Sequence, residues 1–346
     1  MVMELNDALI PHYKCVEIPI HKLKTQIKLS ESYLKEKPTW YIVDGKLQYF
    51  KVRCDLRLFT EQFFSKFGHD VLGLNTLDYK IASVRAFPEG DPLGAGETKI
   101  GLLSENFQDD RYNYYLVNEL LGSEISNLVC YGYSLEGMLE YFKSILAKED
   151  FEKCKDFLIR LFIADSFTMQ MDRNDYNIGF QIKKVDGINY KQRLRPEAIK
   201  KVGQAKELLV EEDGVTKIKG FTPSKVYDNE RILGVDHKNM LIYNSGDVWT
   251  PIWPYRQDLL FTSQEQARKA MEEDYMGLDP NLFELYCNHP ECKEILERLA
   301  YDDEYKKVLE EFENPHSQVA LRRSTQEYFE NLMEERRGVI KKVLSF

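Results

Sequence analysis

The spacing of apolar residues changes near residue 110 and divides the chain into two unlike parts. Before this point, short runs rich in aromatic and β-branched residues alternate with turns, which is typical of strands. Residues 40–43 and 47–53 are two such runs, and Asp44-Gly45 between them is a strong hairpin signal. Beyond residue 110 the apolar residues recur mostly at helical spacing. The sequence therefore predicts an α+β fold, with a small mixed sheet first and a larger helical part second.

The other expected elements follow this division. Residues 58–72 predict one helix within the first part, because Phe63, Phe64 and Phe67 recur at helical spacing. Further strands are expected over residues 79–87, 99–103 and 178–182. Further helices are expected over residues 112–121, 135–147, 151–169, 196–210, 264–274, 291–301, 304–313 and 326–344.

Length and charge restrict the class of protein. At roughly 150 residues per domain, 346 residues suggest two lobes or two domains. A hydrophobic fraction of 43% and a charged fraction of 30% exclude a mainly disordered chain and a collagen-like one. The chain carries 57 acidic and 47 basic residues, and an acidic chain is a poor default ligand for nucleic acid or an anionic membrane. We therefore expect neither a membrane nor nucleic acid as a direct partner.

The cellular compartment is suggested by apolar runs and cysteines. No apolar run approaches the ~18–20 residues of a membrane span, and the first fifteen residues contain no pattern typical of a secretory signal. The six cysteines are scattered and do not describe a disulfide framework. These features predict a cytoplasmic protein.

A polar stretch between a long apolar helix and a short strand has the composition of a catalytic loop. It reads Met-Asp-Arg-Asn-Asp-Tyr-Asn-Ile-Gly-Phe over residues 171–180, with Asp172 and Asn177 five positions apart. Protein-kinase catalytic loops have this spacing, and there the Asp receives the proton of the substrate hydroxyl while the Asn binds Mg²⁺. One such loop can place a carboxylate at the attacking oxygen and an amide oxygen at the metal. Taken alone, the stretch is equally explained as a polar turn that ends a helix.

Two further features occur in the order that a kinase requires. Asp228 lies downstream, where a second acid could bind the metal that bridges the phosphates. Lys51 lies in the middle of an aromatic, β-branched strand and needs a partner or solvent, and Glu61 lies early on the next predicted helix. Each feature also has a plainer explanation: a turn dipeptide at Asp228, an edge-strand lysine in water, and a first-turn glutamate that suits the helix dipole.

Together these stretches resemble the HipA-like Ser/Thr kinases, the family of the HipA C-terminal domain and the CtkA-type kinases. The family's catalytic loop reads Asp-Arg-His-x-x-Asn, and residues 172–177 read Asp-Arg-Asn-Asp-Tyr-Asn. The family's metal-binding acid lies in a Pro-x-x-Tyr/Phe-Asp-Asn type of segment, which is similar to residues 223–229, Pro-Ser-Lys-Val-Tyr-Asp-Asn. Residues 101–107 look like the strand that runs into the nucleotide hinge. The resemblance covers roughly residues 30–310.

The resemblance implies a two-lobe, protein-kinase-like fold with ATP between the lobes. Residues 30–110 would form the N-lobe, residues 111–346 a helical C-lobe with an insertion near 184–220, and residues 1–29 a strap on the N-lobe. The implied activity is ATP- and Mg²⁺-dependent phosphoryl transfer to a Ser or Thr hydroxyl of a protein, including autophosphorylation. The sequence does not name the protein substrate, and the resemblance also allows a regulatory protein partner.

The resemblance assigns a role to each candidate residue. Asp172 would position and deprotonate the hydroxyl, while Asn177 and Asp228 would hold the metal ions. Lys51 would orient the α- and β-phosphates of ATP, and Glu61 would hold Lys51. The residues expected to face adenine through backbone groups are Glu105, Asn106 and Phe107.

Departures from the family pattern keep other functions open. Asn174 stands where the family has His, and residues 14–44 contain no glycine that could form a phosphate-covering loop. A catalytically inactive kinase fold that serves as a binding or regulatory module is therefore one alternative. A lipid or small-molecule kinase is another, because phosphoinositide kinases share the Asp-Arg-His-x-x-Asn loop. An unrelated helical interaction protein, with these motifs by chance, is the third.

A cluster of thiols and an imidazole lies outside these motifs. Cys287, His289 and Cys292 occur within six residues, but structural zinc normally takes four ligands from two separated pairs. No second pair is evident in the sequence. The apolar spacing that follows favours a helical core at this position.

Overall fold

A computed structural model describes the following residues: 16–18, 24–25, 39–43, 46–53, 56–84, 99–107, 111–121, 134–170, 173, 177–186, 196–200, 203–227, 229, 231–233, 235, 279–313 and 321–346. The helix expected over 264–274 and the two acids Asp172 and Asp228 lie outside these residues. Among the described helices, none combines the length and the apolar character that a membrane span requires.

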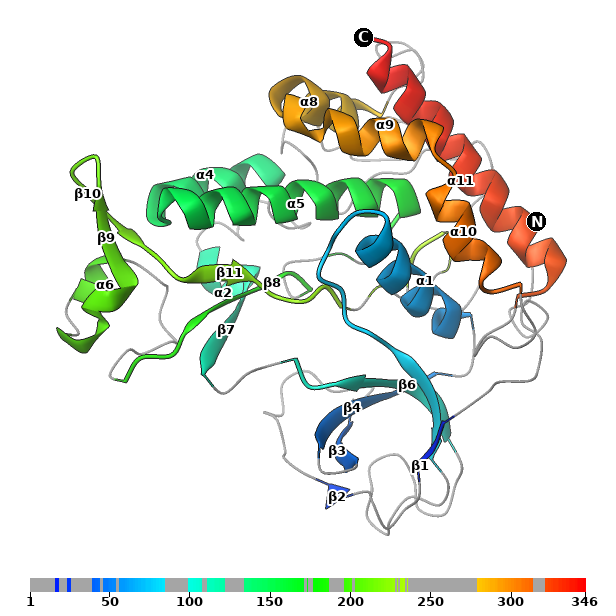
Figure 1. Ribbon diagram of the computed structural model, residues 1–346, viewed down its shortest axis with the longest axis horizontal. Coiled ribbons are helices and arrows are strands. Elements are labelled where there is room, and N and C mark those ends of the chain that lie inside the picture. The colour runs from blue at the N-terminus through cyan, green and yellow to red at the C-terminus, as the bar shows by residue number, and fades with distance from the viewer. Residues whose placement is uncertain are drawn as a thin grey trace.

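The first lobe is built on a six-stranded sheet with the strand order β1-β5-β6-β4-β3-β2 (Figure 1). Its strands are β1 Val16–Ile18, β2 Lys24–Thr25, β3 Thr39–Val43, β4 Lys46–Val52, β5 Lys80–Val84 and β6 Lys99–Glu105. The predicted hairpin is present as β3 and β4, which pair antiparallel with Thr39 opposite Phe50. Two of the strands, β1 and β2, come from the stretch expected to be a strap, and they lie at the two edges of this sheet.

Helix α1, Arg57–Asp70, lies between this sheet and the helical lobe (Figure 1). It is buried on most of its surface, including the polar residues Thr60 and Glu61. A helix of this kind needs apolar partners on more than one side. The ring of Phe59 stacks on Phe329 at a centroid distance of 5.0 Å and meets Phe312 edge-on at 4.9 Å. The helix of the first lobe is therefore held directly by the C-terminal part of the chain.

The second lobe is mainly helical. Its helices are α2 Val117–Leu121, α4 Leu135–Ile145, α5 Lys148–Thr168, α6 Pro196–Lys200, α8 Pro280–Asn288, α9 Lys293–Tyr301, α10 Glu304–Glu310 and α11 Arg323–Leu344, with the 3-10 helices η3 Gly203–Leu208 and η5 Pro290–Cys292. Helix α5 runs through the middle of this lobe (Figure 1), and its side chains Leu158, Leu161 and Ile163 are fully buried. The long helices expected over 135–147, 151–169 and 326–344 are present as α4, α5 and α11.

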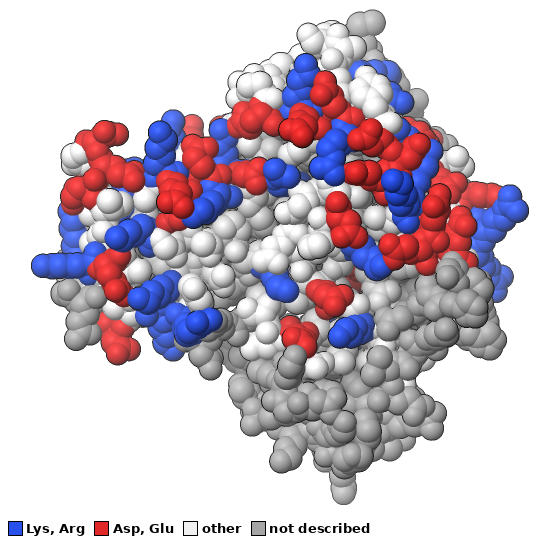
Figure 2. Space-filling model, in the orientation of Figure 1, with Lys and Arg blue, Asp and Glu red and all other residues white. Residues whose placement is uncertain are grey.

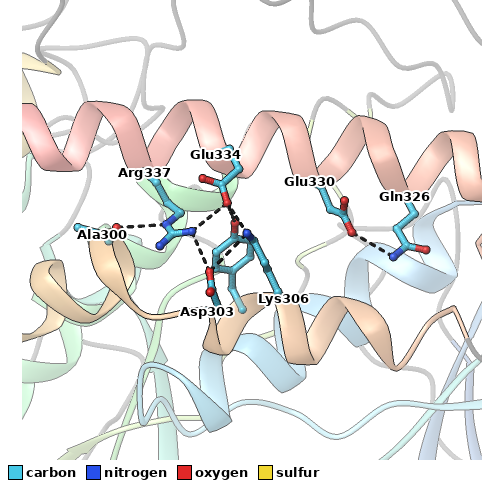
Figure 3. Close-up of polar contacts among 8 residues, drawn as sticks. Ala300, Asp303, Lys306, Gln326, Glu330, Glu334 and Arg337 are labelled. Atoms are coloured by element: carbon cyan, nitrogen blue, oxygen red, sulfur yellow. Dashed lines mark hydrogen bonds and ion pairs between the residues drawn. The ribbon is translucent and has the colours of Figure 1, made fainter.

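A polar cluster joins α11 to α9 and α10 (Figure 3). Arg337 donates to the carbonyl of Ala300 at 3.2 Å, to Asp303 at 3.0 Å and to Glu334 at 2.8 Å. Lys306 pairs with the same Glu334 at 2.7 Å. Hydrogen bonds from the cationic groups and from Tyr305 outweigh the opposing effect of burial and lower the pKa of Glu334 to about 2. The cluster fixes α11, which carries Phe329, and α10, which leads into the turn with Phe312.

A second sheet has the strand order β11-β8-β7, with β7 Tyr112–Leu116, β8 Gly179–Lys183 and β11 Phe221–Pro223. The helix expected over 112–121 is wrong for its first half: residues 112–116 form β7, and only α2 is helical. Strand β7 pairs antiparallel with β8, with Tyr115 opposite Phe180. Aromatic residues favour a paired strand when a partner is present, and this pairing outweighs the local helical spacing.

The expected insertion near 184–220 is not a single helix. The sequence predicts a helix over 196–210, but the chain forms α6, then η3, then a hairpin of β9 Leu209–Glu212 and β10 Val215–Ile218. The turn residues Asp213 and Gly214 both have positive φ, at 50° and 76°. Asp-Gly is the preferred pair for such a two-residue turn, so the hairpin had a local signal.

Candidate active site

Lys51 and Glu61 meet at the junction of the two lobes. Lys51 Nζ lies 3.3 Å from Glu61 Oε1, and the exposed fractions of the two side chains are 13% and 0%. The plainer explanation of Lys51 as an edge-strand residue is wrong, because β4 is paired with β3 on one side and β6 on the other. Burial of a carboxylate is costly unless it is paired and hydrogen-bonded. The contact between the two residues is thus present, while their role toward a nucleotide stays a prediction.

The second oxygen of Glu61 reaches a different part of the chain. Glu61 Oε2 accepts the backbone N–H of Asn229 at 2.8 Å. One buried carboxylate therefore links β4, α1 and the segment that contains the predicted metal ligand Asp228. Asp228 itself lies outside the described residues, but its C-terminal neighbour is fixed by this bond.

Arg173, within the predicted catalytic loop, is fully buried and binds the same segment. Its guanidinium donates to both carboxylate oxygens of Asp165, at 2.9 and 3.1 Å, which is the bidentate geometry of a strong ion pair. It also donates to the carbonyl of Tyr227 at 3.0 Å and to Asn229 Oδ1 at 2.5 Å. The neighbours of Asp172 and Asp228 are thereby joined in one buried network.

The end of α5 directs the chain into this network. Asp165 lies in the last turn of α5, and the helix ends at Met169, which has a left-handed backbone with φ 54°. The N–H of Gln170 returns to the carbonyl of Asp165 at 2.9 Å, and the N–H of Leu233 caps the carbonyl of Thr168 at 2.8 Å. These bonds satisfy carbonyl groups that a helix end leaves without partners. The chain therefore leaves α5 from a fixed point.

The strand after the loop needs a glycine at its first position. A Cβ added to Gly179 would lie 1.9 Å from Tyr114 Oη, far inside van der Waals contact. Tyr114 Oη is held by a hydrogen bond to Tyr227 Oη at 3.1 Å, and burial raises the pKa of Tyr114 to about 12. Asn177, two residues earlier, is buried at the start of this strand. The predicted metal ligand Asn177 thus lies in the bend that leads into β8.

The residues expected near adenine lie at the end of β6. Glu105 is the last residue of that strand and is exposed, whereas Asn106 and Phe107 are half-buried. The ring of Phe107 stacks on Tyr227 at a centroid distance of 5.7 Å and meets Tyr114 at 5.8 Å. Phe107 therefore contacts the segment beside Asp228. The contact of all three residues with a nucleotide stays a prediction.

The structure brings together more residues than the sequence indicated. It joins the predicted pair Lys51–Glu61 to three residues that were assigned no role from the sequence: Arg173, Asn229 and Asp165. Asp165 did carry a signal, because it is an acid in the middle of an apolar helical stripe and such an acid needs a partner. Arg173 and Asn229 lie within the two motif-like segments, but motif spacing does not show that they bind each other across 56 positions.

The thiols near residue 290 lie in different surroundings. Among the described residues, no group of three or more His, Cys, Asp or Glu side chains could hold a metal ion. Cys287 is exposed while Cys292 is buried, and burial raises the pKa of Cys292 to about 12. His289 Nε2 lies 2.9 Å from Glu136 Oε1. The helical-core explanation of this segment is therefore the better one.

Comparison with known proteins places the fold. No family model matches the sequence, and curated proteins also give no match. The proinflammatory kinase CtkA of Helicobacter pylori matches with a TM-score of 0.53 and 12% identity, over 96% of this chain and 98% of that chain. HipA of Shewanella oneidensis MR-1, solved with HipB and operator DNA, matches with a TM-score of 0.44 and 12% identity. That match covers 88% of this chain and 61% of the HipA chain, so the chain spans less than two thirds of its length.

The match to CtkA extends over both lobes and nearly the full length of both chains. The sheet with one helix, the central α5 and the helical C-lobe are consistent with it. The chain shares the fold of the kinase CtkA, in agreement with the two-lobe, kinase-like α+β fold that the sequence predicts.

Proposed function

We propose that the protein is a cytoplasmic kinase that transfers a phosphoryl group from ATP, with Mg²⁺, to a Ser or Thr hydroxyl of a protein. One observation carries this proposal: the buried carboxylate of Glu61 binds Lys51 Nζ and the N–H of Asn229 at the same time. It ties the residue proposed for the phosphates to the segment proposed for the metal. Phosphoryl transfer depends on positioning and electrostatic stabilisation, so a rigid connection of this kind suits it.

The described residues fit a nucleotide with its metal. The Lys51 side chain keeps 13% exposure while its partner Glu61 is fully buried, so Lys51 is the more accessible member of the pair. Asn177 offers an amide oxygen, and Mg²⁺ prefers oxygen ligands. Bound Mg²⁺ would neutralise negative charge on the phosphates. In this proposal Lys51 orients the α- and β-phosphates, Asn177 and Asp228 hold the metal, and Asp172 accepts the hydroxyl proton.

The acceptor and any regulator are also part of the proposal. The substrate is a protein, including this chain itself in autophosphorylation, and a separate regulatory protein is a further proposed partner. Figure 2 shows acidic and basic side chains interspersed over the helical lobe on the face drawn there. A lipid kinase needs a surface that binds an anionic membrane, for which a basic face is the usual device. Together with the net charge of −10, which disfavours binding to an anionic membrane, this pattern leads us to propose a protein acceptor over the lipid alternative.

A binding or regulatory module without turnover is the second candidate. Asn174 in place of the family's His and the lack of glycine over residues 14–44 favour it. Both candidates predict nucleotide binding, but only the kinase predicts transfer. An interaction protein without a nucleotide site predicts neither.

The first experiment compares thermal unfolding with and without Mg²⁺-ATP for the wild type, Asp228→Ala and the control Asp186→Ala. Asp186 is exposed in the turn after β8 and lies outside the proposed machinery. Binding stabilises the native state by about 2.7 kcal/mol at a hundredfold excess of ligand over Kd. We expect a metal-dependent rise in Tm for the wild type and the control that is absent in Asp228→Ala. A wild type that shows no rise at millimolar nucleotide would refute the proposal.

Transfer of radiolabelled phosphate then separates the kinase from the inactive module. Because a general base typically contributes about 10²–10⁴-fold, Asp172→Ala should lower transfer by that factor while leaving nucleotide binding intact. Phosphoamino-acid analysis should find the label on Ser or Thr. Nucleotide binding without transfer to any protein, peptide, lipid or small-molecule acceptor would support the inactive module instead.

A further inference from the structure

Four segments of the chain converge on the guanidinium of Arg173. They are the last turn of α5 with Asp165, the loop that contains Arg173 itself, the segment around Tyr227 and Asn229, and α1, whose Phe64 ring lies 5.5 Å from the Arg173 Cζ. The residue is fully buried. A buried arginine with this many partners has its orientation fixed by them.

The acceptors of Arg173 lie on both sides of the proposed metal ligand. Nη1 donates to the carbonyl of Tyr227, and Nη2 donates to the side chain of Asn229, so the guanidinium binds the residue before Asp228 and the residue after it. Arg173 is also the direct neighbour of Asp172 in the chain. A single planar group therefore connects the backbone at both proposed acids.

We propose that Arg173 is a positioning residue that sets the separation of Asp172 and Asp228, and that Asn229 is its specific partner for this task. This inference rests on the proposed phosphoryl transfer, in which the acceptor hydroxyl and the metal must be aligned. The bidentate bond to Asp165 anchors the guanidinium to α5, and its remaining donors hold the metal-binding segment at a fixed distance from the loop. A displacement of about 1 Å in such a site can lower the rate about 10²-fold.

Lysine cannot replace Arg173 in this task. Its ammonium keeps the charge but has a single nitrogen, so it cannot donate to both oxygens of Asp165 and also reach acceptors on either side of residue 228. Arg173→Lys therefore separates the geometry of the group from its charge. Asn229 offers a second test, because its buried Nδ2 has no hydrogen-bond partner within the described part of the chain. Asn229→Ala removes one bond from Arg173 and one unsatisfied donor together, so its effect on stability should be small.

The experiment measures kcat, KM for ATP, the Mg²⁺ midpoint for transfer and urea unfolding for Arg173→Lys and Asn229→Ala. The matched control is Arg336→Lys, a buried arginine that pairs with Asp279 at 2.8 Å and donates to the carbonyl of Ser166 at 3.0 Å. For Arg173→Lys we expect kcat to fall about 10²-fold and the Mg²⁺ midpoint to rise about 10- to 100-fold, because loss of a group that orients metal ligands has effects of that size. Asn229→Ala should shift the midpoint in the same direction with near-normal stability. Arg336→Lys should lower stability but leave the midpoint unchanged.

The outcomes separate this inference from the proposed function. If the wild type neither binds Mg²⁺-ATP nor transfers phosphate, both fail. If the wild type is active and Arg173→Lys keeps the wild-type kcat and midpoint, only the positioning role fails. If Arg173→Lys does not fold, Asn229→Ala decides: a midpoint equal to that of the wild type overturns the inference, and a raised midpoint in a stable protein supports it.

Discussion

Glu61→Gln tests the connection on which the proposed site depends. The wild-type carboxylate accepts from Lys51 Nζ at 3.3 Å and from the N–H of Asn229 at 2.8 Å. Glutamine has the same shape but offers one acceptor oxygen and one donor amide, so one of the two donors would face another donor. Changing one partner of a buried ion pair costs roughly 3–5 kcal/mol. Because the Lys51 side chain keeps 13% exposure and can regain some hydration, we expect the lower end, about 3 kcal/mol.

Urea unfolding measures this loss, and phosphate transfer measures its functional consequence. The control is Glu149→Gln, which removes an exposed pair with Lys153 on α5. Exposed pairs contribute little to stability, so the control should unfold almost as the wild type does. Glu61→Gln should also lower kcat about 10²-fold, since Lys51 and the segment after Tyr227 lose their common anchor.

A double substitution separates stability from function. Replacing both partners, as Lys51→Met with Glu61→Leu, removes the uncompensated charge and should recover part of the lost stability, but not the transfer activity. The reasoning is refuted if Glu61→Gln matches the wild type in both urea midpoint and kcat. It is equally refuted if the double variant transfers phosphate at the wild-type rate.

Three further predictions follow from the described contacts. Gly179→Ala should lower the free energy of unfolding by about 1–3 kcal/mol, because the added methyl group overpacks against Tyr114. The double variant Gly179→Ala with Tyr114→Ala should lose less than the sum of the two single losses. Additive losses in urea unfolding would contradict this. The pKa of Glu334 is depressed to about 2 from an unfolded value of 4.5, so its contribution is present above pH 4.5 and is lost as the pH falls toward 2. Because the Glu334 side chain is 42% exposed, we expect this contribution to be about 1 kcal/mol. Between pH 4.5 and pH 2, the stability of Glu334→Gln should therefore fall by about that much less than the stability of the wild type, as measured by acid unfolding. Phe329→Ala should lower the free energy of unfolding by about 3–5 kcal/mol. It should also weaken Mg²⁺-ATP binding, because the Phe329 ring stacks on Phe59 of α1. Unchanged nucleotide affinity in the folded variant would show that α1 does not need this support.

Local signals predicted the elements that depend on local structure. The hairpin of β3 and β4 follows from alternating residues and an Asp-Gly turn, and α1 and α5 follow from apolar spacing. Strand β7 could not be predicted in this way, because its stability comes from pairing with β8, which lies more than sixty residues away in the sequence. The start of helix α8 does have a local signal in the sequence: an Asp at the N-cap is followed by Pro at the first helical position.

In the candidate site, too, some features could be predicted from local sequence and others depend on long-range contacts. The order and spacing of Lys51, Glu61 and Asn177 were readable as a motif, and the contact of the first two is present. The bonds that Arg173 makes to Asp165 and Asn229 span 8 and 56 positions. Motif spacing describes which groups touch a substrate, whereas the groups that hold them are set by long-range contacts. Those contacts appear only when the chain is folded.

The stacking of Phe59 on Phe329 has a consequence for how the chain acquires its fold. The two rings are separated by 270 positions, and both are fully buried. During synthesis at about 5–20 residues per second, α1 would wait many seconds before its partner leaves the ribosome. Contacts of such long range also slow the final folding step, because the loop must close before the contact forms. The first lobe therefore cannot complete its core early, and its apolar helix face remains open to chaperones or to misassembly until the last helix arrives.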